Sequence, residues 1–137
     1  MPELPEVEVM RRYLEEASRD KTIESIDFHD PLDKVYKYSR EELREALEGA
    51  VMQNTERRGK YLFVELSSGP WLHIHFGMTG NLELFRGEEL PSYSRLVWNF
   101  QEGDRLAFRD LRKFGVLEII ESPAQFCRDH KLGVDLL

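Results

Sequence analysis

The first residues of the chain place a proline at position 2 among several carboxylates. Removal of the initiator methionine would leave Pro2 with a free secondary amine. An α-amino group titrates at about 7.7–8.0, against about 10.4 for lysine, so much of it is unprotonated at neutral pH and can form a Schiff base with a carbonyl carbon. Glu3 is a candidate proton donor beside it. The same stretch also suits a helix start, because Pro5 fits the first turn and Glu6 complements the helix dipole.

Three short loops between expected strands carry further residues of chemical interest. In the loop 57–60, glycine allows a close backbone approach and Lys60 supplies a positive charge. The loop 75–80 presents Met78 between two glycines, where an apolar side chain can act as a wedge between DNA bases. The loop 109–115 combines basic residues with an aromatic residue, which suits contacts to the phosphate backbone of a nucleic acid and stacking on its bases. Each loop taken singly also fits an ordinary turn.

Two histidines share one face of an expected strand. His73 and His75 have types that could contribute to a metal site. No acid or cysteine is placed in the sequence to complete a ligand set, so solvent-facing histidines are the simpler interpretation. The single Cys127 excludes an internal disulfide framework and a multi-cysteine zinc site. The sequence therefore predicts no metal site.

Length and charge limit the class of protein. The 137 residues are enough for one domain with a core. The net charge of −7 argues against a protein that coats nucleic acid unspecifically, because phosphate binding normally needs a basic footprint. The sequence shows neither a signal peptide nor a membrane span. Together with the single cysteine, this predicts a cytoplasmic protein with no membrane partner.

The elements that must position these residues follow from hydrophobic periodicity. The helical period predicts helices over 5–19 and 39–48, the second capped by Ser39, and a short helix after Ser122. In the first helix we expect ion pairs of Glu8 with Arg12 and of Glu15 with Arg19. Its expected buried stripe is Leu4, Val7, Met10, Leu14 and Ala17. The period of two predicts strands over 22–28, 51–57, 61–66, 71–76, 81–85, 96–100, 105–109 and 116–121. The predicted fold is α+β, mainly an antiparallel β-sandwich or flattened barrel flanked by an N-terminal helix and a second helix.

Taken together, the motifs resemble the N-terminal domain of the formamidopyrimidine-DNA glycosylase family, which includes the endonuclease VIII type. The similarity covers essentially the whole chain and is nearer to the formamidopyrimidine type. The matching segments, in the order of the family, are Pro2 to Glu8, Gly59 to Leu62, His75 to Gly80, Asp110 to Gly115, and Leu132-Gly133.

The resemblance implies a bifunctional enzyme of base excision repair, a DNA-formamidopyrimidine glycosylase and DNA-(apurinic or apyrimidinic site) lyase. Its substrates would be oxidised purines, formamidopyrimidine and 8-oxoguanine, in damaged double-stranded DNA. By the same resemblance, Pro2 attacks the sugar carbon that bears the damaged base and forms the Schiff base. Glu3 is the proton donor, Glu6 supports the site, and Lys60 contacts phosphate and assists strand elimination.

The resemblance also implies the DNA-binding residues. Met78, Arg112 and Phe114 would fill the gap left by the flipped nucleotide and hold its partner base, and His75 and Lys113 would contact the DNA backbone. The sequence departs from the family at two places. Where family members usually carry His-Asp-His, this chain reads Ser-Tyr-Ser-Arg, and the expected substitutes are Tyr93 or Arg95. Lys113 stands where arginine is frequent.

The family normally continues into a helix–two-turn–helix module and often a zinc finger. Residues 1–137 are expected to be the N-terminal catalytic domain alone, with these regions absent. We expect no cofactor in this chain, and zinc only in the missing region. The acidic charge would then belong to one half of a longer protein. We expect a monomer. The alternative is an isolated non-catalytic domain of the same fold that binds DNA or a protein partner.

Overall fold

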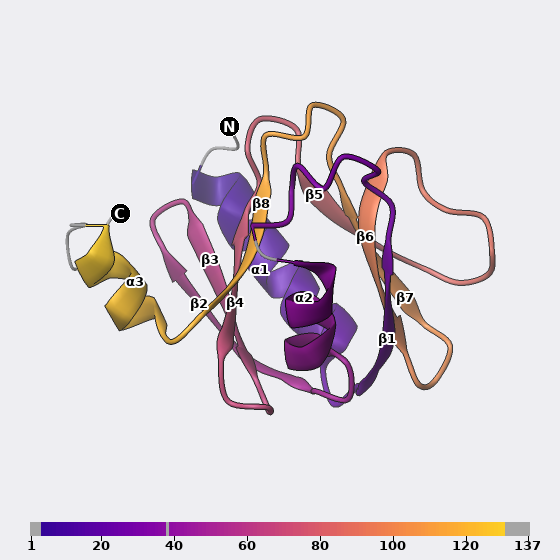
Figure 1. Ribbon diagram of the computed structural model, residues 1–137, viewed down its shortest axis with the longest axis horizontal. Helices are drawn as coiled ribbons and strands as arrows, with labels where there is room; N and C mark the ends of the chain where they lie inside the picture. The colour runs from indigo at the N-terminus through magenta and orange to yellow at the C-terminus, as the bar shows by residue number, and fades with distance from the viewer. Residues whose placement is uncertain (1–3, 38, 131–137) are drawn as a thin grey trace.

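The computed structural model describes residues 4–37 and 39–130, with side chains from Glu6 onward (Figure 1). The elements in chain order are α1 (Leu4–Ser18), β1 (Ile23–Phe28), α2 (Arg40–Leu47), β2 (Met52–Arg58), β3 (Tyr61–Leu66), β4 (Trp71–His75), β5 (Asn81–Phe85), β6 (Ser94–Phe100), β7 (Arg105–Arg109), β8 (Val116–Ile120) and α3 (Pro123–Asp129). The strands form two four-stranded antiparallel sheets, ordered β1-β6-β7-β5 and β2-β3-β4-β8. The predicted antiparallel α+β sandwich is confirmed.

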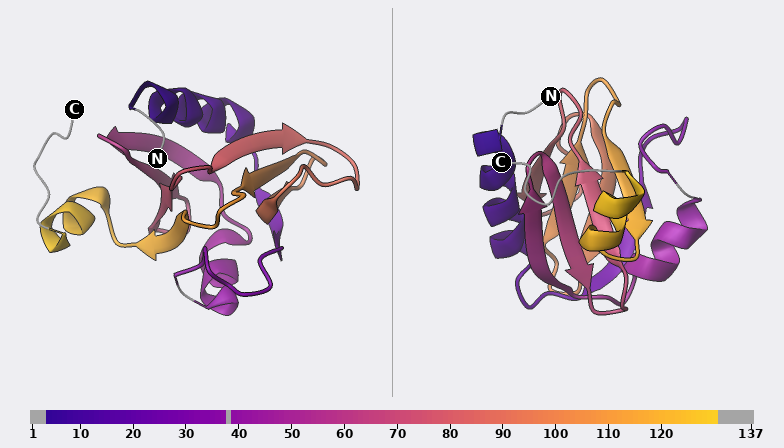
Figure 2. Two further views of the ribbon diagram at one scale, coloured as in Figure 1. Left: turned by 90° about the horizontal axis from the view of Figure 1, so that it is seen from above. Right: turned by 90° about the vertical axis from the view of Figure 1, so that its left-hand side faces the viewer.

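The two longer helices close the open sides of this sandwich. α1 contacts β2 and β5, which are edge strands of different sheets, and α2 contacts β1 and β8, the two opposite edges. Figure 2 shows α1 and α2 on opposite sides of the pair of sheets, with α3 away from both. Each helix therefore supplies an apolar face where a sheet would otherwise expose its edge and the core between the sheets.

α1 begins one residue earlier than predicted, at Leu4, so Pro5 lies within its first turn. The expected Glu8–Arg12 pair is present at 3.0 Å, but Glu15 pairs with Arg11, at 3.4 Å, rather than with Arg19. Its inward side chains are Val7, Leu14 and Ala17, with Met10 partly buried against them. The side chain of Leu4 lies outside the part that the structure describes.

A β-bulge changes the expected alternation of β1. The sequence predicts Ile23 and Ile26 on opposite faces, because their positions differ by three, an odd number. Both are buried, at 0 % and 2 % exposure, since the pairing of β1 with β6 shifts register between Ile23 and Ser25. The extra residue of the bulge returns Ile26 to the core face.

The capping predictions for the shorter helices are confirmed. Ser39 precedes α2 and its hydroxyl accepts the backbone N–H of Glu42 over 3.2 Å. Ser122 caps α3 in the same way through Gln125, at 3.1 Å. α3 ends at Asp129, and the expected stop at Gly133 lies outside the described residues. No helix in the described ranges is long and apolar enough to cross a membrane.

The sheet β2-β3-β4-β8 is covered on both faces near α3. Phe63 of β3 is fully buried in a small second cluster with Phe126 and Cys127, on the face away from the main core. His73 points to this same side and is only 3 % exposed. The prediction of a solvent-facing His73 is therefore wrong, because α3 covers that face and the period of two cannot reveal the covering helix.

Candidate functional site

Two of the three chemically interesting loops meet backbone to backbone. Gly77 has φ +64°, and a Cβ placed on it would lie 2.6 Å from the carbonyl carbon of Phe114 and 2.7 Å from the nitrogen of Gly115. Both distances are far below any van der Waals contact. Glycine is therefore required at position 77 for its left-handed conformation and for the close approach of the loops 75–80 and 109–115.

Asp110 fixes these loops to each other. Its carboxylate is fully buried and accepts the Thr79 hydroxyl at 2.6 Å through Oδ1 and the Gly115 backbone N–H at 2.8 Å through Oδ2. The Thr79 hydroxyl oxygen in turn accepts the backbone N–H of Arg112 over 3.1 Å. Neither Asp110 nor Thr79 was among the predicted site residues. An Asp at the start of a turn is a known signal for hydrogen bonds to the backbone of its own loop. This signal does not predict that the same carboxylate also binds the loop 75–80.

A third loop joins the same junction. The backbone N–H of Asp110 donates to the carbonyl of Tyr93 at 3.0 Å, and Arg95 Nε donates to the carbonyl of Asp110 at 2.9 Å. The guanidinium of Arg95 is thus occupied by the backbone of loop 109–115. Of the two expected substitutes for the family histidine, Tyr93 is the one left with its side chain in solvent, 53 % exposed.

The joined loops present one apolar surface with a cation. We call it the loop surface; its members are Met78, Tyr93, Leu111, Arg112 and Phe114, all exposed. The Arg112 guanidinium carbon lies 5.2 Å from the centroid of the Phe114 ring, a cation–π arrangement. Large apolar side chains at half exposure on three adjoining loops are unusual for a soluble surface, and they are suited to insertion between stacked bases.

Lys113 does not point out with its neighbours. Its ammonium pairs at 2.8 Å with the carboxylate of Asp30, a fully buried residue. Burial alone would raise the pKa of Asp30, but the hydrogen bond from Lys113 and several backbone N–H donors hold it below its usual value. A role of Lys113 in contacting the DNA backbone stays a prediction, and the structure gives this ammonium a partner inside the protein.

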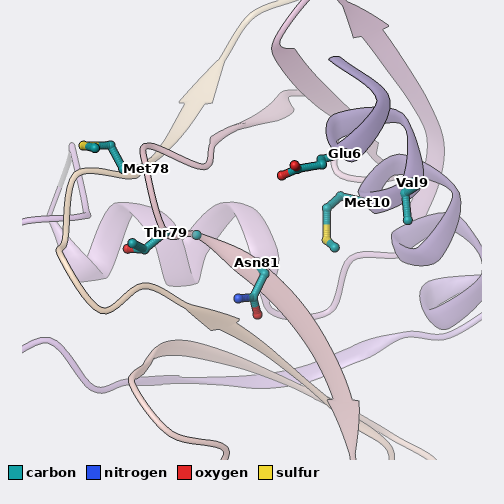
Figure 3. A pocket seen from close by; sticks show the side chains of 7 residues that line it. Glu6, Val9, Met10, Met78, Thr79 and Asn81 are labelled. Carbon is teal, nitrogen blue, oxygen red and sulfur yellow. The ribbon is translucent and has the colours of Figure 1, made fainter. Parts of the chain in front are cut away.

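A groove of about 400 Å³ runs between the N-terminal half of α1 and the loop after β4. It is lined by Glu6, Val9, Met10, Met78, Thr79, Gly80 and Asn81. Figure 3 shows Glu6 and Met10 extending from α1 toward the loop, while Met78 projects away from them at its far end. The groove therefore joins the first turn of α1, at Glu6, to the loop surface. Pro2 and Glu3 themselves lie outside the described residues.

An ion-pair cluster holds α1 against the turn that carries Lys60. Glu8 binds Arg11 at 2.7 Å and Arg57 at 3.0 Å, and Arg57 donates to the carbonyl of Gly59 at 3.1 Å. The hydrogen bond from Arg11, with those from Arg57 and Arg12, lowers the pKa of Glu8 to about 2. The first turns of α1 and the Gly59-Lys60 turn are therefore kept at the same end of the sandwich.

His75 ends β4 at the edge of the loop 75–80. Its Nδ1 accepts the backbone N–H of Gly77 at 3.2 Å, which leaves the ring proton on Nε2. Burial, and then the neighbouring His73, lower its pKa. His75 is therefore a neutral donor at neutral pH, a form that can bind an anion without carrying charge. In residues 4–37 and 39–130, no three His, Cys, Asp or Glu side chains gather as a metal site would require.

The chain is similar to known proteins over most of its length. The family model described as formamidopyrimidine-DNA glycosylase N-terminal domain matches residues 1–117. The formamidopyrimidine-DNA glycosylase of Pelobacter propionicus is 42% identical over 118 residues, which are 85% of this chain and 43% of that protein. The one from Paraburkholderia phymatum is 36% identical over 148 residues, 99% of this chain and 49% of that protein.

Solved structures show the same likeness. The Lactococcus lactis formamidopyrimidine-DNA glycosylase bound non-covalently to DNA with an AP site has a TM-score of 0.87 and 32% identity, covering 96% of this chain and 51% of that one. A MutM complex with DNA containing carbocyclic 8-oxoguanine has the same TM-score and identity. The chain spans about half the length of the curated relatives it matches. It belongs to the formamidopyrimidine-DNA glycosylase family.

Proposed function

We propose that this chain carries the catalytic half of a bifunctional DNA glycosylase and AP lyase that removes oxidised purines, formamidopyrimidine and 8-oxoguanine, from double-stranded DNA. The observation that carries the proposal is the junction at Asp110. It fixes three loops so that Met78, Arg112 and Phe114 stand exposed at the end of a groove that begins at Glu6. An enzyme that acts on a base must take it out of the stack and fill the gap, and this surface suits that task.

In the proposed reaction, the Pro2 amine attacks the sugar carbon that bears the damaged base. The bond to the base breaks, the base leaves with a proton, and the sugar opens to a Schiff base with the proline nitrogen. Glu3 supplies protons for base release and ring opening, and Glu6 supports it from the first turn of α1. Lys60 contacts the phosphate and assists the elimination that cuts the strand.

The net charge of −7 is compatible with this proposal if phosphate binding is shared. The relatives contain a further half that this chain does not span, and the proposal assigns much of the phosphate neutralisation to that half. The partner is damaged duplex DNA, bound by a monomer inside the cell.

Borohydride trapping tests the catalytic proposal. The processed chain, with loss of Met1 verified by mass spectrometry, is incubated with duplexes that carry 8-oxoguanine or an abasic site and is then reduced. The same assay is run on a chimaera that adds the C-terminal half of the Pelobacter propionicus relative. A covalent adduct that forms with the processed chain and disappears when Met1 is retained supports the proposal. A processed chimaera that binds the duplex but gives no adduct would refute it.

A second candidate is a non-catalytic domain of the same fold that binds DNA or a protein partner, and the net charge of −7 favours the protein partner. This function predicts DNA affinity that depends on the loop surface and does not require removal of Met1. Binding by a chain that retains Met1, equal to that of the processed chain and without any adduct from either, would support it.

A further inference from the structure

A second cavity lies on the outer face of the sheet β2-β3-β4-β8, on the far side of His75 from the groove. Its volume is about 480 Å³, and its lining includes Lys34, Lys37, Tyr61, His73, His75 and Phe114. Phe114 belongs to the loop surface, so the cavity begins where that surface ends. The sequence pattern did not single it out, because its members come from five separate segments.

The floor of the cavity holds a buried acid–base pair. His73 Nδ1 lies 2.8 Å from Glu118 Oε1, and the two side chains are 4% and 6% exposed. The other carboxylate oxygen, Oε2, pairs with the Lys37 ammonium at 3.2 Å. Burial would raise the pKa of Glu118, but His73 and Lys37 together hold it below its usual value. Glu118 is the acid in the cavity lining, and both of its oxygens are occupied.

The remaining polar groups of the cavity come from lysine, tyrosine and histidine side chains: Lys34, Lys37, Tyr61, His73, His75 and His130. Lys34 is exposed and has no ion pair among the described side chains. His75 presents Nε2–H because its Nδ1 accepts from Gly77. Tyr61 lies beside it, with ring centroids 6.3 Å apart. His73 Nε2 is buried and has no hydrogen-bond partner in the described part of the chain.

We propose that this cavity binds a phosphate group of the DNA backbone, held by Lys34 and Lys37 with hydrogen bonds from Tyr61 and His75. The proposal rests on the proposed function, since it extends the DNA contact from Phe114 across the outer face of the sheet. Glu118 repels the anion less than a free carboxylate would, because Lys37 pairs with one of its oxygens and His73 forms a hydrogen bond with the other. The pair also positions Lys37, whose ammonium would otherwise be free to leave the cavity.

The position of these donors favours DNA over an unrelated anion. Two lysines lie around one paired carboxylate, so the cavity is locally basic although the chain has a net charge of −7. They also adjoin the aromatic ring that the proposed function inserts into the duplex. A phosphate close to an inserted side chain fixes the register of the protein on the duplex and carries no sequence information.

Equilibrium binding to a short duplex with an abasic-site analogue, measured over a range of salt concentrations, tests the site. Each phosphate contact contributes about 0.9 to the slope of log affinity against log salt, so Lys34→Ala should lower the slope by about one and weaken binding several-fold. Arg19→Ala removes an exposed charge at the opposite end of α1 and should leave the slope unchanged. Lys37→Arg should keep the slope, whereas Lys37→Ala should lower it.

Nuclear magnetic resonance of the side chains of His73 and His75 distinguishes the sources of phosphate. Shifts with the duplex that are lost in Lys34→Ala support the site. Shifts with inorganic phosphate together with an unchanged salt slope in Lys34→Ala indicate an adventitious ion only and overturn it, as does no shift with either probe. Borohydride trapping by the wild-type chimaera is independent of these results, so a failure of the proposed chemistry remains distinguishable from a failure of the anion site.

Discussion

Thr79 donates its hydroxyl hydrogen to the buried carboxylate of Asp110 over 2.6 Å, although the two residues belong to different loops of the sandwich. The same hydroxyl accepts the backbone N–H of Arg112. One small side chain thus ties together the loops that expose Met78 and Phe114. Since the loop surface must be rigid to displace a base, this contact links the fold to the proposed function.

Replacing Thr79 by Val removes the hydroxyl at nearly constant shape. The Asp110 carboxylate loses a donor and the Arg112 N–H loses an acceptor, so the free energy of unfolding should fall by about 1–3 kcal/mol. Urea denaturation measures the change. Thr22→Val is the matched control, because the Thr22 hydroxyl has no hydrogen bond among the described residues, and it should change stability little. Equal effects of the two variants would contradict a special role of Thr79.

Gly77→Ala tests the close approach of the two loops. Alanine there must adopt φ +64° and its Cβ would overlap the backbone of Phe114 and Gly115. Gly87 has φ +89° with open space around it, so Gly87→Ala carries the conformational cost alone, about 1 kcal/mol. Gly77→Ala should be destabilised by about 1–3 kcal/mol beyond this control because of the overlap. Thermal unfolding of both variants provides the comparison, and matching melting temperatures would exclude a tight junction.

Acid should loosen α1 through Glu8. Its pKa in the folded state is about 2, against an ordinary value of 4.5. A lowered carboxyl pKa stabilises the fold above the unfolded value, and the contribution is lost as pH falls from about 4.5 through about 2. Glu8→Gln should therefore cost about 1 kcal/mol at neutral pH, a value reduced by solvent screening.

The same variant should also flatten the dependence of stability on pH in this acid range. Denaturation curves at several pH values compare it with Glu16→Gln, an exposed acid on the same helix with no ion pair among the described side chains. Parallel profiles of unfolding free energy against pH for wild type and Glu8→Gln would show that the ion pairs of Glu8 contribute nothing to stability.

Phe114→Ala should impair DNA binding and leave the fold intact. The ring is 49 % exposed, so its removal costs little burial. Base–aromatic stacking contributes about 1–3 kcal/mol, so affinity for a duplex with an abasic-site analogue should fall roughly tenfold. Leu32→Ala serves as control, since Leu32 is apolar and even more exposed but lies outside the loop surface. Fluorescence anisotropy measures both, and equal affinities of the two variants would argue against stacking by Phe114.

Lys113→Met separates an internal ion pair from a DNA contact. Loss of the ammonium leaves the buried Asp30 carboxylate unpaired, so stability should fall by about 3–5 kcal/mol. The double variant Lys113→Met with Asp30→Asn should recover part of this loss. A stable Lys113→Met with a salt slope of DNA binding reduced by about one would show instead that Lys113 contacts phosphate.

The sequence by itself determined the elements and the kinds of residue in the loops. Periodicity located both longer helices and all eight strands, because local propensity and burial act over a few residues. Ser39 and Ser122 identified helix starts, since capping is a contact between residues three apart. The motifs around Gly77 and Phe114 carried enough identity to suggest the family before any contact was known.

Only the tertiary structure decided which loops meet and which charges face inward. Asp30 pairs with Lys113, and Asp110 with Thr79, across long stretches of chain that no local period connects. A period of two likewise assigns His73 to a face but does not show that α3 covers it. Whether a polar group is buried and paired depends on segments distant in the sequence that pack against it. For this reason His73, predicted to face solvent, is instead a buried partner of Glu118.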